Sequence, residues 1–285
     1  TRRLRTASIA RIGGYAPGFD NLNVTANALR AAIGAKLVDV PLDTLIDTAK
    51  AGVATAANVA ADFEDTSELN DEKTARFNGL VAGIDALRAR GGYDAVTIKC
   101  WGDLAERYGI AGCGAASWLN GHDRIVACEG DVNGALSLMI ARALSHEAGF
   151  LTDLVKVDPD SNKALLWHIG CAASCLAQPG QPRKLHSHFA GGKGVTASFA
   201  LRPGRITLFR LGEDGRGHFR LLATTGVCLP TQASLRGTIA EIHFDSKAAA
   251  FLNELLNNGW EHHLVMAYGD LRADLAMLAR ALPVS

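Results

Sequence analysis

The stretch IVACEGDVNGAL (residues 125–136) decides the fold, because an apolar run ends on a carboxylate and turns at once into a helix. Such a short, uninterrupted run is typical of a strand that is buried on both faces of a parallel sheet. Glu129 is therefore expected at the C-terminal edge of the sheet, where open α/β folds place their ligand sites. A buried carboxylate is costly unless a metal ion or a positive side chain compensates it, so this position indicates a bound cation.

The segments around this stretch predict a Rossmann-like α/β domain over residues 1–148. The expected elements alternate along the chain, with strands at 8–12, 36–40, 95–99 and 124–128 and helices at about 43–61 and 68–90. Strands and helices that alternate in this way form βαβ units. The Gly-rich turn at 13–18 does not match G-x-G-x-x-G, and neither a Walker A nor a G-x-S-x-G motif occurs, which disfavours kinases, dehydrogenases and serine hydrolases.

The pattern changes after about residue 149. Short apolar runs are separated by turns such as Pro203-Gly204 and Asp214-Gly215, and this spacing is typical of an antiparallel sheet or barrel. The end of the chain returns to a helix at 247–257, a strand at 264–268 and a helix at 271–282. We therefore expect a second, C-terminal domain over residues 149–285, built on an antiparallel β-barrel with flanking helices.

Composition excludes several classes of partner. Lysine plus arginine equals aspartate plus glutamate, 29 of each in 285 residues, so no basic field is present to attract nucleic acid or an anionic membrane. No apolar run approaches the roughly 18–20 residues of a membrane span. The six cysteines are sparse and form no C-x-x-C pair, which favours free thiols in a reducing cytoplasm. Because Thr1 is not an initiator methionine, we expect a processed, trimmed or excerpted chain.

Carboxylates and histidines stand within or next to several apolar runs, Glu129, Asp153, His168 and His263 among them. Taken singly, each is more often a solvated or hydrogen-bonded polar residue than a ligand. Together, two carboxylates and imidazole suit Mn²⁺ or Mg²⁺ better than a structural zinc site, which would recruit thiolates. An ion of this kind keeps open positions for two neighbouring oxygens of a polyol, while the carboxylates move protons between carbons.

Short motifs follow one another in a characteristic order. They are IKCWGDL (98–104), ACEGDV (127–132), Asp153-Leu154, WHIG (167–170) and EHH (261–263), with Gly269-Asp270 beyond the last. This series resembles the L-fucose isomerase and L-arabinose isomerase superfamily, especially its smaller fucose-isomerase-like branch. The resemblance runs from about residue 8 to residue 284, and its specific parts are the Cys-Glu-Gly-Asp segment and the His-x₅-Gly-Asp spacing.

The resemblance implies a metal-dependent aldose–ketose isomerase that acts on a monosaccharide through a cis-enediol. Mn²⁺ is the usual ion, with Mg²⁺ or Co²⁺ as other divalent candidates. The implied metal ligands are Glu129, Asp153, His263 and, as the candidate for a fourth, His168. Glu129 and Asp153 would also form the proton-transfer pair. The spacing to Gly269 favours His263 over its neighbour His262 as the ligand.

Three further residues are expected to contact the sugar. Lys99 and Trp101 follow the strand that precedes the strand of Glu129, so they face the same cleft. The alternative for Lys99 is a cap at the end of that strand. His262, adjacent to the predicted ligand His263, is the third.

The resemblance also implies an architecture of two Rossmann-like domains followed by a C-terminal barrel domain. This chain has room for the second α/β domain and the C-terminal domain. Relatives of this kind assemble as trimers or hexamers, so we expect a homo-oligomer. The main alternative function is a non-catalytic carbohydrate-binding or regulatory homologue that lacks the first domain, and a third is a metal-dependent enzyme acting on another polyol or sugar acid.

Overall fold

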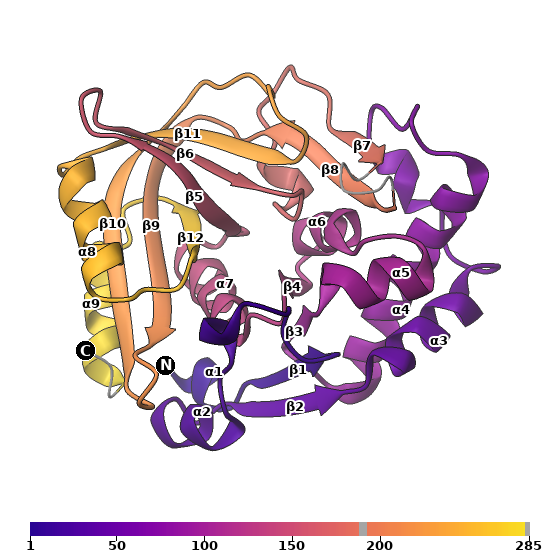
Figure 1. The fold of residues 1–285 in the computed structure, drawn as a ribbon, viewed down its shortest axis with the longest axis horizontal. Coiled ribbons are helices and arrows are strands. Elements are labelled where there is room, and N and C mark those ends of the chain that lie inside the picture. The colour runs from indigo at the N-terminus through magenta and orange to yellow at the C-terminus, as the bar shows by residue number, and fades with distance from the viewer. Residues whose placement is uncertain (188–192, 283–285) are drawn as a thin grey trace.

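Two β-sheets organise the molecule, which is described from a computed structural model (Figure 1). The structure describes residues 1–187 and 193–282, and of Trp101 it describes the backbone only. A four-stranded sheet has the strand order β2-β1-β3-β4, and an eight-stranded sheet has the order β10-β9-β12-β5-β6-β11-β8-β7. The prediction of an α/β fold is confirmed.

All strands of the smaller sheet run parallel, as the sequence pattern predicts. They are β1 (Ser8–Ile12), β2 (Lys36–Val40), β3 (Ala95–Ile98) and β4 (Ile125–Cys128). Every residue of β3 is buried, as is typical of a strand covered on both faces. The strand order reverses between β1 and β3, and open parallel sheets bind ligands outside the carboxyl ends of the strands at such a switch point.

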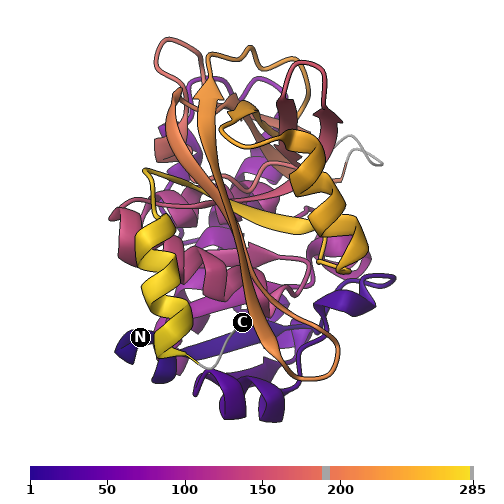
Figure 2. The ribbon, with the colours of Figure 1, turned by 90° about the vertical axis from the view of Figure 1, so that its left-hand side faces the viewer.

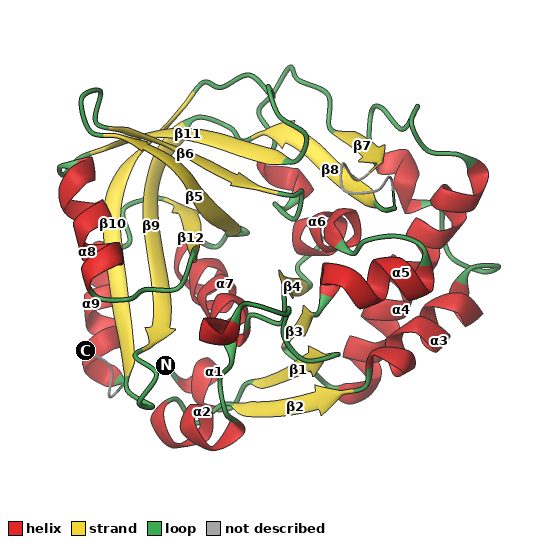
Figure 3. Ribbon diagram, viewed as in Figure 1, coloured by secondary structure: helices red, strands yellow, loops and turns green. Residues whose placement is uncertain are grey.

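Helices surround this sheet (Figure 3). They are α1 (Arg2–Arg5), α2 (Ala26–Ala32), α3 (Leu42–Gly52), α4 (Asp71–Gly91), α5 (Ala105–Tyr108) and α6 (Cys113–Gly121), with short helical turns η1 (Asp20–Leu22), η2 (Val59–Asp62) and η3 (Cys100–Leu104). Helix α4 is capped at its start by Asn70, whose side chain accepts a hydrogen bond from the Lys73 amide at 2.9 Å, and at its end by Gly92 in the left-handed conformation. The predicted helix at 68–90 is thereby confirmed.

The predicted helix at 43–61 is wrong in its second half. Helix α3 ends at Gly52, and only the separate turn η2 follows before α4. The Ala56 amide donates to the Gly52 carbonyl at 2.8 Å, so the chain closes a turn there. Glycine has a low helix propensity, and the alanine-rich residues after it offer no apolar stripe to hold the helix on the core.

The larger sheet occupies the second half of the chain. Its strands are β5 (Phe150–Asp158), β6 (Lys163–His168), β7 (Lys184–Ser187), β8 (Val195–Ala200), β9 (Gly204–Glu213), β10 (Phe219–Leu229), β11 (Thr238–Phe244) and β12 (His263–Tyr268), with the turn η4 (Ser174–Leu176) between β6 and β7. Figure 2 shows the long hairpin of β9 and β10 running between the two C-terminal helices, α8 (Ala248–Asn257) and α9 (Arg272–Ala281). The expected C-terminal helix–strand–helix order is confirmed.

This sheet is mixed. Most neighbours are antiparallel, but β11 and β8 run parallel over the pairs Thr238–Phe199 and Ile239–Ala200. Strand β10 pairs along one edge with β9 and at its end with β11. A parallel α/β sheet followed by a large mixed sheet with flanking helices is therefore the observed architecture.

Helix α7 (Val132–Ser145) joins the two sheets. It follows β4 after a three-residue turn and contacts β3 and β4 on one side and β9 and β12 on the other (Figure 1). Residues 132–141 are all buried, as expected of a helix that is enclosed all round. The segment 125–136 thus carries the chain from one sheet into the interface with the other, and it places the end of β4 next to the start of β12.

In the described ranges, no helix combines the length and apolar character needed to cross a membrane.

Candidate active site

A strained turn between β4 and α7 presents Glu129. Its φ is +63° and that of Gly130 is +78°, both in the left-handed region that side chains other than glycine rarely adopt. The Glu129 carbonyl accepts from the Ala16 amide at 2.9 Å, and the Gly130 amide donates to the Ile98 carbonyl at 3.1 Å. These bonds fix the turn against the neighbouring strand ends, and the Glu129 side chain is left only 9% exposed.

Neighbouring strands of the larger sheet supply the other predicted ligands. His263 begins β12 and pairs in register with Asp153 on β5. Asp153 in turn pairs with Trp167 on β6, and His168 is the next residue. Because β12, β5 and β6 are adjacent in the sheet, these three side chains meet at one place although they are far apart in the sequence.

The predicted ligands gather around His263. Its Nε2 lies 3.3 Å from Glu129 Oε2 and 3.8 Å from Asp153 Oδ1. Ligand atoms of Glu129, His168 and His263 all lie within 4.8 Å of one another, and so do those of Asp153, His262 and His263. The four predicted ligands and His262 therefore form two overlapping groups that share His263.

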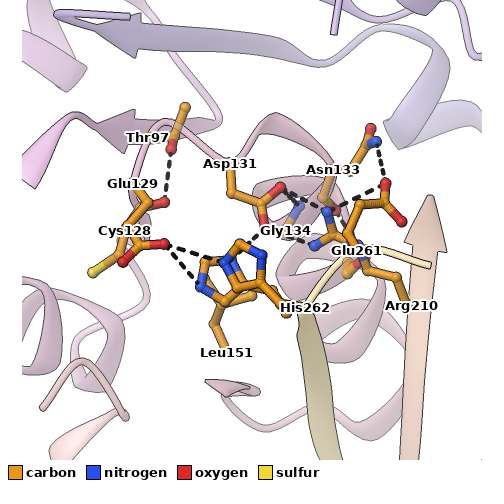
Figure 4. A network of polar contacts seen from close by, with 12 residues as sticks. Thr97, Cys128, Glu129, Asp131, Asn133, Gly134, Leu151, Arg210, Glu261 and His262 are labelled. Atoms are coloured by element: carbon orange, nitrogen blue, oxygen red, sulfur yellow. Dashed lines mark hydrogen bonds and ion pairs between the residues drawn. The ribbon is translucent and has the colours of Figure 1, made fainter. Parts of the chain in front are cut away.

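Asp131 binds His263 through Nδ1, the ring nitrogen that does not face Glu129. Its Oδ2 lies 2.9 Å from His263 Nδ1, and both carboxylate oxygens accept from Arg210, at 2.7 and 2.9 Å (Figure 4). It also caps α7 by accepting from the Gly134 amide at 2.7 Å. An ionised carboxylate only accepts, so Nδ1 of His263 carries the proton and its Nε2 faces Glu129 and Asp153.

A second buried carboxylate completes the surroundings of Arg210. Glu261 lies 3.6 Å from the guanidinium and accepts from the Glu213 amide at 3.1 Å and from Asn133 Nδ2 at 3.3 Å. The Arg210 side chain is fully buried and that of Glu261 is 2% exposed. One buried cation thus compensates two buried carboxylates behind the site.

The site favours positive charge. Burial lowers the pKa of His263, but Asp131 and Glu129 outweigh it and raise the pKa to about 9. Burial likewise lowers the pKa of His168, but Cys171, Asp153 and Glu129 raise it to about 10. Burial alone would raise the pKa of Glu129, yet His262 and His263 hold it far below its usual range. The carboxylate is therefore ionised, and the two imidazoles bind protons in its field.

The donor set fits a divalent cation. Nε2 of His263 and both ring nitrogens of His168 are buried and have no hydrogen-bond partner among the described residues. Buried polar atoms without a partner are costly, and a cation held by Glu129, His168 and His263 would satisfy them. Oxygen and imidazole ligands suit Mn²⁺, Mg²⁺ or Co²⁺. Such an ion would also replace the protons that the imidazoles attract.

The three predicted sugar contacts have different surroundings. His262 lies 3.4 Å from Glu129 Oε2 and its ring centroid is 4.7 Å from that of Phe19, with 31% of its side chain exposed. Lys99 follows β3, and its Nζ pairs with Asp103 at 2.8 Å. The side chain of Trp101 lies outside the described part of the chain, so its predicted contact stays a prediction. His262 adjoins the site, whereas Lys99 is engaged by a neighbour on its own turn.

Sequence reasoning missed the network behind the site. Arg210 stands within the otherwise apolar core of β9, a position where a charged side chain requires a buried partner, and this signal was available in the sequence. Asp131 follows Glu129 by two residues, but its role as a helix cap and histidine partner depends on how α7 packs against β9 and β12.

Fold and site define an α/β protein with a carboxylate–histidine site at the junction of two sheets. Residues 170–285 match the family model described as the L-fucose isomerase C-terminal domain. The chain is 29% identical over 294 residues to the sulfoquinovose isomerase of Alkalicoccus urumqiensis, a match that covers 99% of this chain and 65% of the relative. The sulfoquinovose isomerase of Priestia aryabhattai is 28% identical over 289 residues, a match that covers 99% of this chain and 64% of the relative. The sulfoquinovose isomerase of Clostridium sp. strain MSTE9 is 29% identical, with 98% of this chain and 64% of the relative covered.

The whole chain is thus similar to sulfoquinovose isomerases, and residues 170–285 match the model of the L-fucose isomerase C-terminal domain. The predicted resemblance is confirmed. The chain spans about two thirds of the length of these relatives, 64–65%.

Proposed function

We propose that this protein is an aldose–ketose isomerase of monosaccharides. The observation that carries the proposal is the convergence of Glu129 and Asp153 on His263 Nε2, at 3.3 and 3.8 Å. Two carboxylates that flank one small space can pass a proton between neighbouring carbons of a sugar. The kinship with proteins called sulfoquinovose isomerases supports the same reaction class.

Glu129, His168 and His263 would hold the divalent cation, and Mn²⁺ is the ion we propose first. Asp153 would lie beside the cation, because its carboxylate is close to His263. When bound, such an ion supplies Lewis acidity, which polarises the sugar carbonyl and orients its neighbouring hydroxyl.

The carboxylates perform the proton transfers. One of them removes the proton from C2 of the open-chain aldose, which leaves a cis-enediolate. The O2 proton then passes to O1, and the carboxylic acid returns its proton to C1, which gives the ketose and restores the carboxylate. Glu129 is ionised and therefore able to accept a proton. Asp153 is more open to solvent, with its side chain 31% exposed against 9% for Glu129. We therefore propose Glu129 as the buried member and Asp153 as the solvent-facing member of the pair.

The remaining contacts to the sugar are proposed from the positions of residues around the site. His262, half-exposed beside Glu129, and Lys99, at the carboxyl end of β3, are proposed to contact sugar hydroxyls. Trp101 is proposed as a further contact on sequence grounds. Because the relatives are called sulfoquinovose isomerases, a sugar with a sulfonate group is the first substrate to test.

Further proposals concern the whole protein. We propose a homo-oligomer, a trimer or hexamer, and a cytoplasmic location. The two-domain division at residues 148 and 149 also stays a proposal. The closed path of strand pairing from β10 through β9, β12, β5, β6 and β11 back to β10 supports the proposal of a barrel in the second domain.

The test is an isomerase assay on the chain loaded with Mn²⁺, against sulfoquinovose and a panel of aldoses, with the ketose measured by NMR in D₂O. Glu129→Gln and Asp153→Asn should each lower turnover by about 10²–10⁴-fold, the usual contribution of a placed acid or base. Asp158→Asn, at the exposed end of the same strand as Asp153, and Glu241→Gln serve as controls and should leave turnover unchanged. Stoichiometric sugar binding with neither turnover nor deuterium exchange would favour the non-catalytic homologue instead.

A further inference from the structure

Four buried cysteines gather beside the candidate active site. Cys100 follows β3, Cys113 begins α6, Cys128 ends β4 and Cys171 follows β6, so each comes from a different part of the fold. The Cys128 thiol lies near those of Cys100, Cys113 and Cys171, and Cys100 also lies near Cys113. All four are free thiols. The sequence spacing gives no hint of this cluster, because no two of them form a C-x-x-C pair.

An imidazole completes the cluster. Ligand atoms of Cys128, Cys171 and His168 all lie within 4.8 Å of one another, and all three residues are buried. Neither ring nitrogen of His168 has a hydrogen-bond partner within the described ranges. His168 is thus placed to serve as a ligand either with the two thiols or with Glu129 and His263. A fully buried imidazole without partners is an independent sign that a ligand belongs there.

We propose that Cys128, Cys171 and His168 form a second cation site, which takes a thiophilic divalent ion such as Zn²⁺ or Cd²⁺. Thiolate and imidazole are the ligands such ions prefer. With Zn–S near 2.3 Å and Zn–N near 2.0–2.1 Å, tetrahedral geometry sets the ligands about 3.5–3.8 Å apart, so the present separations need only a small closure. The fourth position would be taken by water or, after a side-chain movement, by the thiol of Cys100 or Cys113, both of which lie near Cys128.

The site goes beyond the proposed isomerase and does not depend on it, since neither thiol takes part in the proton transfers. It does share His168 with the first group of ligands. An ion bound to the thiols therefore withdraws one donor from the oxygen-rich site. The cluster is in this way an inhibitory site for thiophilic metals.

One contact opposes the proposal. The Cys171 thiol donates to the Leu151 carbonyl at 3.5 Å, and this bond is lost when the thiol is deprotonated on metal binding. Hydrogen bonds from thiols are weak, so the loss is small beside the gain of a metal–thiolate bond.

The experiment is a titration of the full chain, reduced with a phosphine, with Cd²⁺ while the ultraviolet thiolate-to-metal charge-transfer band is recorded. Wild-type protein should show a band that saturates at one equivalent. Cys128→Ser and Cys171→Ser should each weaken binding by about a hundredfold or more, because even indirect partners of metal ligands contribute about 10–100-fold. His168→Gln should weaken binding similarly but keep a band at saturation, since both thiols remain.

Two matched controls lie outside the cluster, the buried Cys228→Ser and the exposed Cys175→Ser. Both should titrate like the wild type, and circular dichroism checks that every variant is folded. If Cys171→Ser does not fold, the Cd²⁺ affinity of His168→Gln tests the proposal. This variant should fold, because the ring nitrogens of His168 have no hydrogen-bond partner among the described residues and their removal leaves no other group unsatisfied. Absence of a band at one equivalent, or unchanged Cd²⁺ affinity in His168→Gln, would overturn the proposal.

Discussion

Arg210 and Asp131 form a two-pronged ion pair, with N–O distances of 2.7 and 2.9 Å, in which neither side chain is exposed to solvent. The pair joins β9 of the larger sheet to the first residue before α7. It therefore links the two sheets directly behind His263. Because Asp131 also binds His263, the geometry of the candidate site depends on this pair.

Removing the guanidinium should destabilise the protein strongly. Arg210→Met removes the buried cation beside Glu261 and leaves Asp131 with His263 alone, and breaking such a buried pair costs about 3–5 kcal/mol in the free energy of unfolding. Arg236→Met is the matched control, because it removes a partly exposed pair with Glu68 and should cost about 1 kcal/mol or less. Urea denaturation measures both, and equal losses in the two variants would contradict the role assigned to the buried pair.

Asp131→Asn should impair metal binding through the tautomer of His263, in addition to the stability it loses with the buried ion pair. An asparagine can present its NH₂ group to His263 Nδ1, which moves the ring proton to Nε2, the nitrogen that faces Glu129. Loss of such a partner typically lowers metal affinity by about 10–100-fold. Isothermal titration with Mn²⁺ tests this, with Asp158→Asn as the control. Unchanged affinity in Asp131→Asn would show that His263 keeps its orientation without the carboxylate.

The sequence predicted those parts of the site that lie at strand ends. Glu129 follows an apolar run, and His263 precedes one, so the polarity of each residue stands out from its surroundings. Their meeting was not predictable from the pattern alone, because it depends on the pairing of β12 with β5 and on the packing of α7 between the sheets. The family resemblance supplied that step.

The parts that the sequence did not predict depend on contacts between distant elements. Strand β11 was missed because polar residues interrupt its apolar ones, and its place between β6 and β8 appears only in the folded sheet. The cysteine cluster combines side chains from four elements with no regular spacing. Arg210 gave a local signal, but its partner lies 79 positions away in the chain.

Gly130 should be intolerant of any side chain. A Cβ atom there would lie 2.3 Å from the Gly14 carbonyl oxygen and 2.4 Å from Tyr15 Cα, and the φ of +78° adds strain. Together, strain and overpacking should cost Gly130→Ala about 3 kcal/mol or more. Gly180→Ala isolates the strain, because its φ is +81° with nothing within 4 Å, and should cost about 1–2 kcal/mol. Similar losses in thermal or urea unfolding would refute the steric argument.

The ion pair of Glu64 with Arg183 connects the loop before α4 to the segment before β7, and it should make stability depend on pH. The Arg183 side chain holds the pKa of Glu64 below its usual value of 4.5. Because the folded pKa is depressed, the stabilisation is complete above about pH 4.5 and is lost as the pH falls through the folded value. Glu64→Gln should therefore be less stable than the wild type near pH 7, by about 1 kcal/mol or less since the pair is half-exposed, and the difference should shrink as the pH falls below 4.5.

Glu213 provides a control of opposite sign. Burial raises the pKa of its carboxyl, and the nearby Asp214 and Glu261 add to the shift. A raised folded pKa means that the neutral form is stabilising at low pH and that this contribution disappears as the pH rises through the folded value. Glu213→Gln should thus gain stability relative to the wild type at neutral pH, where Glu64→Gln loses it. Urea unfolding of Glu64→Gln, Glu213→Gln and the wild type at a series of pH values between 3 and 7 tests both predictions. If the two variants differ from the wild type in the same direction at neutral pH, the loss of one negative charge, rather than the environment of each carboxyl group, governs the pH dependence of stability.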